Sequence, residues 1–309
     1  MTRLQNENGG CRRICLHPLF FFLCGLLSVS SSVLAEDFHN LIDVAPHPWI
    51  SIGVGSMPSH AFQNYAGSFA KQMTSLTTEI PFAGDSLSGW SMRASFHTTA
   101  VEVSFLPKRV SLLSGVVGLS KRIYNDAENQ YVVSCGVGFA SDGQLLDAVR
   151  FRFSGIGIGI HSWNRDFALL YGLSYSYVLG RGFLLPVAGF RWELSDDVSF
   201  RTMLPFSFRL CYRANERWSF GLKVMLDGDR FQYFNDGNTF SAPQHAYLRL
   251  TQLTCGTDFM LTISPLLSLS GEVGVAVARR LWISSDSRDF LAAKINPGGY
   301  MLATARFFL

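Results

Sequence analysis

The sequence predicts an all-β protein: a closed antiparallel transmembrane β-barrel of about 12–14 strands that follows a cleaved signal peptide. Three observations predict this fold: an export signal at the start, the composition of the whole chain, and a period-two alternation of apolar residues. Aromatic residues make up 14% of the chain and glycines number 28, but charged residues are only 16%. A soluble domain usually carries about 25% charged residues, so this composition favours a chain embedded in lipid.

The first 35 residues have the order of a secretory signal peptide. Basic residues precede a short apolar run at 19–27, and small residues then lead to Ala35. The run is too short for a membrane anchor, because a spanning helix needs about 20 apolar residues. We therefore expect export with cleavage after Ala35. This divides the chain into a signal peptide, 1–35, and an outer-membrane β-barrel domain, 36–309.

The charges and cysteines indicate no nucleic-acid partner and no metal or other cofactor. The formal net charge is only +3, and the chain lacks the clustered basic stripe of a nucleic-acid-binding protein. Beyond the signal region, Cys135, Cys211 and Cys255 are odd in number and widely spaced. They predict no disulfide framework, and without a Cys-x-x-Cys pair we expect no structural zinc.

Residues 167–179 show most clearly the period-two pattern of a membrane-embedded strand. The odd positions from Phe167 to Leu179 are aromatic or aliphatic, whereas the even positions are mostly small. Successive side chains of a strand face opposite sides, and a barrel in lipid needs one apolar face. The pattern recurs at 131–139, 206–213, 218–226 and 267–280.

Short polar spacers separate these segments and predict hairpins. The spacers near Asn164, Asp196, Asn215 and Ser264 are too short for parallel crossovers. Counting segments predicts about fourteen strands, or twelve, because residues 90–105 could form one bulged strand or two. The predicted strands begin near Trp49, Ser88, Ala100, Val110, Tyr131, Ala148, Phe167, Phe183, Val198, Phe206, Arg217, Ala246, Leu266 and Gly298.

An even number of strands places both ends of the barrel domain on one side, taken as the periplasm. Longer polar stretches at 56–85, 227–244 and 284–297 are expected to be loops. Counting back from the end puts the last two outside the cell and the tight turns inside. Long outer loops and short inner turns are typical of outer-membrane barrels.

Two segments resemble known families. In residues 301–309 the odd positions are all apolar and alternate with Leu302, Thr304, Arg306 and Phe308. This ending resembles the C-terminal signal of outer-membrane barrels, although Leu309 stands where those families usually have Phe or Trp. The resemblance implies recognition of the last strand by the barrel-assembly machinery. The segment 183–233, with LLPVAGF at 184–190 and WSFG at 218–221, is similar to a family of uncharacterised bacterial outer-membrane barrels known only as a domain of unknown function. That resemblance implies the fold and outer-membrane lipid as the surroundings, but it brings no activity.

With the apolar side of each strand facing lipid, the opposite side assigns charged residues to the lumen. Nine are basic, namely Arg93, Arg150, Arg152, Arg191, Arg201, Arg209, Arg213, Lys223 and Arg306. Four are acidic, namely Glu102, Glu193, Asp227 and Glu272. Because basic side chains in a water-filled pore favour anions, we predict a pore for small solutes, with anions as the candidate class. The predicted pore-lining residues are Arg152, Arg191, Glu193, Arg201, Arg209, Arg213, Lys223, Glu272 and Arg306.

Two other interpretations remain open. In the first, paired charges plug a narrow barrel, which then has a structural or surface-binding role. In the second, the barrel is an enzyme, but the seven histidines are scattered and no nucleophile has a base at a recognisable spacing. We therefore expect no catalytic residues.

Overall fold

The computed structural model describes residues 48–84, 88–104, 110–126, 128–141, 151–176, 182–234, 245–284 and 289–309. The predicted signal peptide, 1–35, and Arg150 lie outside these described residues. No helix within the described ranges is long and apolar enough to cross a membrane. The elements are β1 (Trp49–Ala61), β2 (Ser68–Gly84), β3 (Gly89–Val103), β4 (Val110–Tyr124), β5 (Asn129–Ser141), β6 (Phe151–Ser162), β7 (Phe167–Ser176), β8 (Phe183–Glu193), β9 (Val198–Leu204), β10 (Ser207–Arg213), β11 (Trp218–Phe234), β12 (His245–Ser264), β13 (Leu267–Ser284), β14 (Asp289–Ile295) and β15 (Gly298–Phe308).

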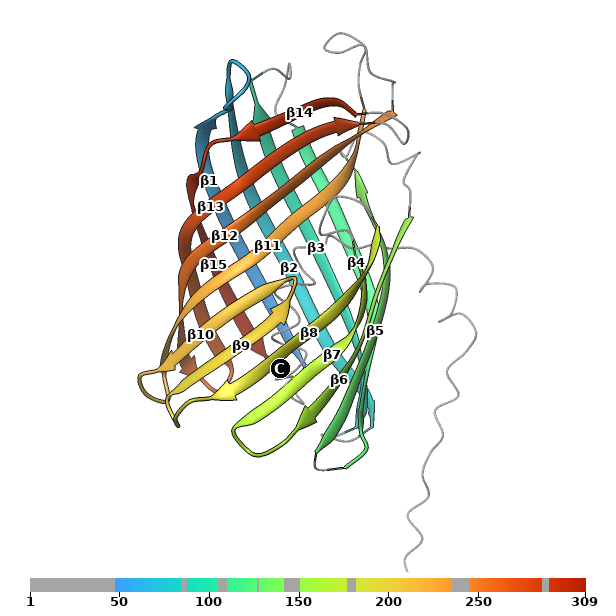
Figure 1. The fold of residues 1–309 in the computed structure, drawn as a ribbon, viewed down its shortest axis with the longest axis vertical. Helices are drawn as coiled ribbons and strands as arrows, with labels where there is room; N and C mark the ends of the chain where they lie inside the picture. The colour runs from blue at the N-terminus through green and yellow to red at the C-terminus, as the bar shows by residue number, and fades with distance from the viewer. Residues whose placement is uncertain are drawn as a thin grey trace, which may run out of the picture.

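The strands form one antiparallel sheet that closes on itself (Figure 1). Each strand from β1 to β13 pairs with the next, and β1 closes the barrel by pairing with β15, with Trp49 opposite Phe308. The first part of β13 pairs with β15, whereas its last part pairs with β14. β14 and β15 therefore share one position in the wall, so the predicted closed barrel of fourteen positions is confirmed.

The outer face of the wall is apolar. Large apolar side chains at outward positions are exposed, among them Phe153, Leu184, Leu222 and Met301, each with more than half of its surface accessible. Continuous exposed apolar surface marks a region that contacts lipid or a partner. Alternate residues on the same strands point into the barrel. The period-two pattern therefore arises, as predicted, because successive side chains face the outer surface and the lumen in turn.

Two errors cancel in the predicted strand count. The stretch 56–85 was expected to be a loop, but β1 runs to Ala61 and β2 occupies Ser68–Gly84. Conversely, the two strands predicted near Ser88 and Ala100 are one strand, β3. β2 was missed because Gln72 and Thr74 face outward and interrupt its apolar side.

The other two predicted loops are also partly strand. β11 continues from Trp218 to Phe234 and β14 covers Asp289–Ile295, so 227–234 and most of 289–297 extend the wall. Some of their polar residues face the lumen, and others lie at the end of the barrel that projects beyond the lipid. The described ends of the chain lie at one end of the barrel, since Trp49 pairs with Phe308.

One side of the wall is much lower than the other. β9 and β10 have 7 residues each, whereas β11 has 17 and β12 has 20. The β9–β10 hairpin therefore ends partway up the barrel (Figure 1). Beyond it, β11 makes a parallel bridge to β5, between Gln232 and Ser141. Because β5 lies almost opposite β11 in the strand order, this contact pinches the outer half of the barrel.

Two apolar clusters fill parts of the interior. The outer cluster, which includes Phe69, Leu112, Leu248, Leu281 and Ile283, is packed into the pinched half with each of these side chains 0–1% exposed. The side cluster, which includes Val132, Ile156, Leu170, Val187 and Met203, fills the space beside β5–β9. The two clusters leave part of the lumen unfilled next to β1–β3, β11–β13 and β15.

Candidate functional site

A central chamber lies in the lumen, between the outer cluster and the end of the barrel where Trp49 pairs with Phe308. It is a cavity of about 120 Å³ whose wall comes from β1–β3, β11–β13 and β15. Four basic side chains (Lys71, Arg93, Lys223 and Arg306) and two acidic ones (Asp227 and Glu272) line it. The apolar lining includes Met57, Met73, Met225, Tyr300 and Leu302.

Two further cavities adjoin the central chamber. One, of about 110 Å³, shares Lys223, Glu272 and Arg306 with it and extends along β10 and β12. The other, of about 20 Å³, shares Lys71 and Asp227 and reaches the outer cluster. The three cavities together trace a route from the inner half of the barrel to the packed outer half.

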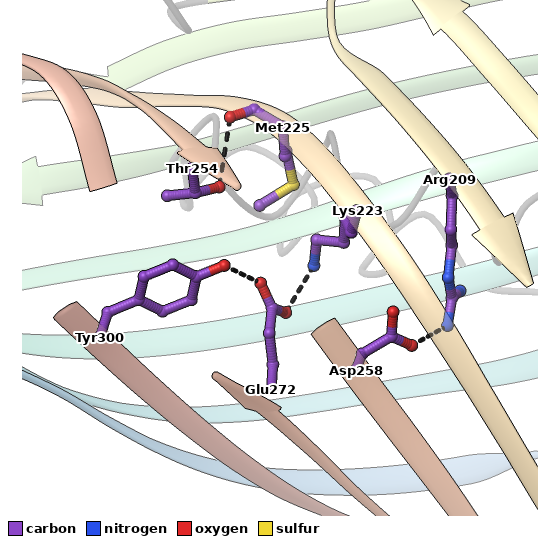
Figure 2. Close-up of polar contacts among 7 residues, drawn as sticks. All are labelled: Arg209, Lys223, Met225, Thr254, Asp258, Glu272 and Tyr300. Atoms are coloured by element: carbon purple, nitrogen blue, oxygen red, sulfur yellow. Dashed lines mark hydrogen bonds and ion pairs between the residues drawn. The ribbon is translucent and has the colours of Figure 1, made fainter. Parts of the chain in front are cut away.

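Glu272 holds two donors in the wall of the central chamber (Figure 2). Lys223 Nζ lies 2.6 Å from one carboxylate oxygen, and the hydroxyl of Tyr300 donates to the other at 2.5 Å. These residues come from β11, β13 and β15, where the alternation turns them inward. Lys223 and Glu272 are each less than a tenth exposed. Burying the ammonium of Lys223 or the carboxylate of Glu272 without its partner would be costly, so the three side chains hold one another in place.

A second ion pair joins Arg209 to Asp258 (Figure 2). Arg209 lies on β10 and Asp258 on β12, so the pair reaches across β11. Gly221 of β11 leaves the necessary room, because a Cβ there would lie 2.3 Å from Oδ1 of Asp258. Both side chains of this ion pair line the second cavity.

A third ion pair crosses the lumen beneath the outer cluster. Nζ of Lys71 on β2 lies 3.9 Å from Oδ2 of Asp227 on β11, and the side-chain amide of Gln252 donates to the same oxygen at 2.7 Å. All three line the central chamber. Because β2 and β11 are five positions apart in the strand order, this contact spans the interior and narrows it.

A buried arginine lies within the outer cluster. Arg279 is 1% exposed, donates to the carbonyl oxygen of Asn296 at 3.2 Å and lies over the ring of Phe69. It points inward because β13 has an extra residue near Ala278, whose φ is +49°. Such a bulge reverses the alternation, so inward positions change from even numbers before it to odd numbers after it.

The predicted pore-lining residues fall into three groups. Lys223, Glu272 and Arg306 line the central chamber, and Arg209 lines the second cavity. Arg191, Glu193 and Arg201 form a separate, partly exposed triplet, with Glu193 3.7 Å and 4.0 Å from the two arginines. Arg152 is buried on β6, and Arg213 is exposed at the end of β10; neither lines the three cavities.

The assignment of Glu102 to the lumen is wrong. Glu102 is exposed between the inward-facing, buried Val101 and Val103 of β3. Conversely, sequence reasoning missed Lys71 and Glu79 because it missed β2. Lys71 and Glu79 could have been found from their odd positions, which they share with Met73, Ser75 and Thr77 on the inward face of β2. Within the described ranges, no group of three or more His, Cys, Asp or Glu could hold a metal ion.

Comparisons with known proteins agree with this fold. A family described as a domain of unknown function (DUF6268) matches residues 94–304, about two thirds of the chain. No curated protein matches the chain by sequence. An outer-membrane channel from Pseudomonas putida F1 is 7% identical and superposes with a TM-score of 0.50, covering 85% of this chain and 96% of its own. The toluene transporter TodX of Pseudomonas putida is 9% identical, with a TM-score of 0.41 and coverage of 92% and 95%. The first similarity shows a shared outer-membrane barrel fold, and the second is too distant to add to it.

Proposed function

Since the chain belongs to the family described as a domain of unknown function, DUF6268, we propose its function from its own geometry. The protein is a channel of the bacterial outer membrane for small solutes, and its outer end is closed in this conformation. The observation that supports this proposal best is the run of three adjoining cavities, which ends at the outer cluster. The apolar outer face supports the location in a membrane.

The charge on the chamber wall favours anions among those solutes. Four of its six Lys, Arg, Asp and Glu side chains are basic. A low-dielectric wall concentrates the field of such charges inside a cleft, and basic residues favour anion passage. The proposal assigns no catalytic step to the barrel.

Conductance through planar lipid bilayers tests the proposal. We expect the wild-type protein to give small, infrequent conductance steps, with a reversal potential in a KCl gradient that favours chloride. Phe69→Ala should increase the frequency or size of the steps, because Phe69 is fully buried in the outer cluster. Leu76→Ala is the matched control, since Leu76 lies on the same strand, β2, but faces outward.

Folding and location are verified on the same preparations. Heat-modifiable migration on gels shows whether each variant is a closed barrel, and fractionation shows whether it lies in the outer membrane. Bilayers that stay sealed with both wild type and Phe69→Ala, when both are folded, would overturn the channel. A wild-type protein recovered from the soluble periplasm would overturn the location.

A further inference from the structure

The inner mouth of the central chamber holds two arginines against one indole ring. Trp49, the first residue of β1, is 4% exposed. The guanidinium carbon of Arg306 lies 4.6 Å from the centroid of its ring, and that of Arg93 lies 5.3 Å from it. The face of an indole attracts cations. Trp49 therefore contacts two guanidinium groups, and both of these arginines line the chamber.

A carboxylate of the neighbouring strand β2 contacts one of the two arginines. Glu79, which is 2% exposed, has Oε2 at 3.9 Å from Nη1 of Arg93, and its other oxygen accepts a hydrogen bond from Ser91 at 2.9 Å. Of the six Lys, Arg, Asp and Glu side chains that line the chamber, four are basic and two are acidic. Guanidinium groups bind carboxylates and phosphates through parallel hydrogen bonds. The local charge and donor geometry therefore suit an incoming anionic group.

The chamber wall away from the mouth is suited to a different kind of group. Met57, Met73, Met225 and Leu302 line it. Methionine side chains are flexible and polarisable and adapt to apolar groups of varied shape. A small, fully polar anion would leave this apolar surface without a matching partner. A neutral hydrocarbon, in turn, would make no use of the two guanidinium groups.

We propose that the central chamber binds a small amphipathic anion, a monocarboxylate with a short apolar body. Arg93 and Arg306 hold the carboxylate beside Trp49, and the methionines contact the apolar body. The proposal rests on the proposed channel function and names the solute class of the same chamber. The volume of about 120 Å³ restricts the bound part of the solute to a small one.

Titration calorimetry on the full barrel in detergent micelles tests this assignment. The probes are hexanoate, 1-hexanol, hexylamine and acetate, each measured against protein-free micelles. We expect hexanoate to bind at least about tenfold more tightly than the other three, because only it offers both a carboxylate and an apolar body. Equal binding of hexanol and hexanoate, or of acetate and hexanoate, would overturn the proposal.

Single substitutions at the mouth show whether hexanoate binds to these two arginines or responds only to the net charge of the protein. Arg306→Gln and Arg93→Gln should each weaken hexanoate binding about tenfold or more, through loss of charge-assisted hydrogen bonds. Arg213→Gln is the matched control and should bind as the wild type does, because Arg213 is exposed outside the chamber. Hexanoate should also change the tryptophan fluorescence of the wild type, and Trp49→Phe should abolish that change. Unchanged binding in both folded arginine variants would overturn the proposal.

Conductance of the same preparations distinguishes this proposal from the channel function. A protein that conducts ions but does not bind hexanoate overturns the solute class alone. If the protein binds hexanoate with the expected arginine dependence but never conducts ions, the binding site is supported and the proposed channel function is overturned.

Discussion

Removal of the ammonium group of Lys223 tests the buried ion pair with Glu272. Lys223→Met keeps most of the apolar stem and removes one donor from the carboxylate of Glu272, to which the hydroxyl of Tyr300 still donates at 2.5 Å. Breaking a buried pair in this way costs about 3–5 kcal/mol of folding free energy. We expect about 3 kcal/mol, the low end, because that hydrogen bond remains and the chamber can admit water.

Guanidinium-induced unfolding, followed by tryptophan fluorescence, measures this loss as a lower midpoint with an unchanged slope. The double variant Lys223→Met/Glu272→Gln should recover most of the loss, because the unpaired buried charge is then gone. Arg191→Met is the control. Arg191 and Glu193 are 3.7 Å apart with side chains 30% and 34% exposed, so its loss should stay below about 1 kcal/mol.

Two results would refute the reasoning about Lys223. The first is a loss in Lys223→Met no larger than that in Arg191→Met. The second is a double variant whose loss equals the sum of the two single losses, because additivity would mean that the two side chains do not interact.

Three further predictions concern packing, a turn and the outer cluster. Gly172→Ala should lower the free energy of unfolding by about 1–3 kcal/mol, because its Cβ would lie 2.0 Å from the carbonyl oxygen of Gly157, whereas Gly157→Ala, with no atom within 4 Å of its Cβ, should not. In the β4–β5 turn, the backbone hydrogen bond from Asn129 holds the pKa of Asp126 below its ordinary 3.8. The stabilisation is therefore present above pH 3.8 and is lost as the pH falls below it, so acid should destabilise the wild type more than Asp126→Asn in pH-dependent unfolding. Leu281→Ala, at a side chain 0% exposed, should cost about 2–5 kcal/mol and increase bilayer conductance; unchanged conductance would count against closure by the outer cluster.

The sequence predicted the barrel well where lipid and lumen impose opposite demands on a strand. β7, β11 and β13 have apolar residues on one face and small or polar residues on the other, and their existence was predicted. The rule failed for β2, where Gln72 and Thr74 face outward. It also failed beyond Ala278, where a bulge reverses the inward side of β13.

The candidate site was predicted only in part, for a related reason. Alternation placed Arg209 and Lys223 inside, but their partners depend on which strands lie two positions apart after closure. Asp258 was not among the acidic residues assigned to the lumen, and it meets Arg209 because Gly221 leaves room across β11. The outer cluster was not predicted either, because Leu248 and Leu281 are apolar residues on an inner face that was expected to be polar.

The low β9–β10 hairpin has a consequence for the surrounding lipid. Seven residues extend about 24 Å along a strand, and a tilt of about 40° reduces this to about 18 Å of height, less than the apolar band of about 25 Å typical of outer-membrane barrels. In the outer membrane proposed for this protein, the bilayer must thin beside β9 and β10, at a cost of fractions of a kcal/mol for each Å of hydrophobic mismatch. The taller β11 and β12 impose no such thinning. In that membrane we expect the bilayer to thin more beside β9 and β10 than beside β11 and β12, and this asymmetry would tilt the barrel relative to the bilayer normal.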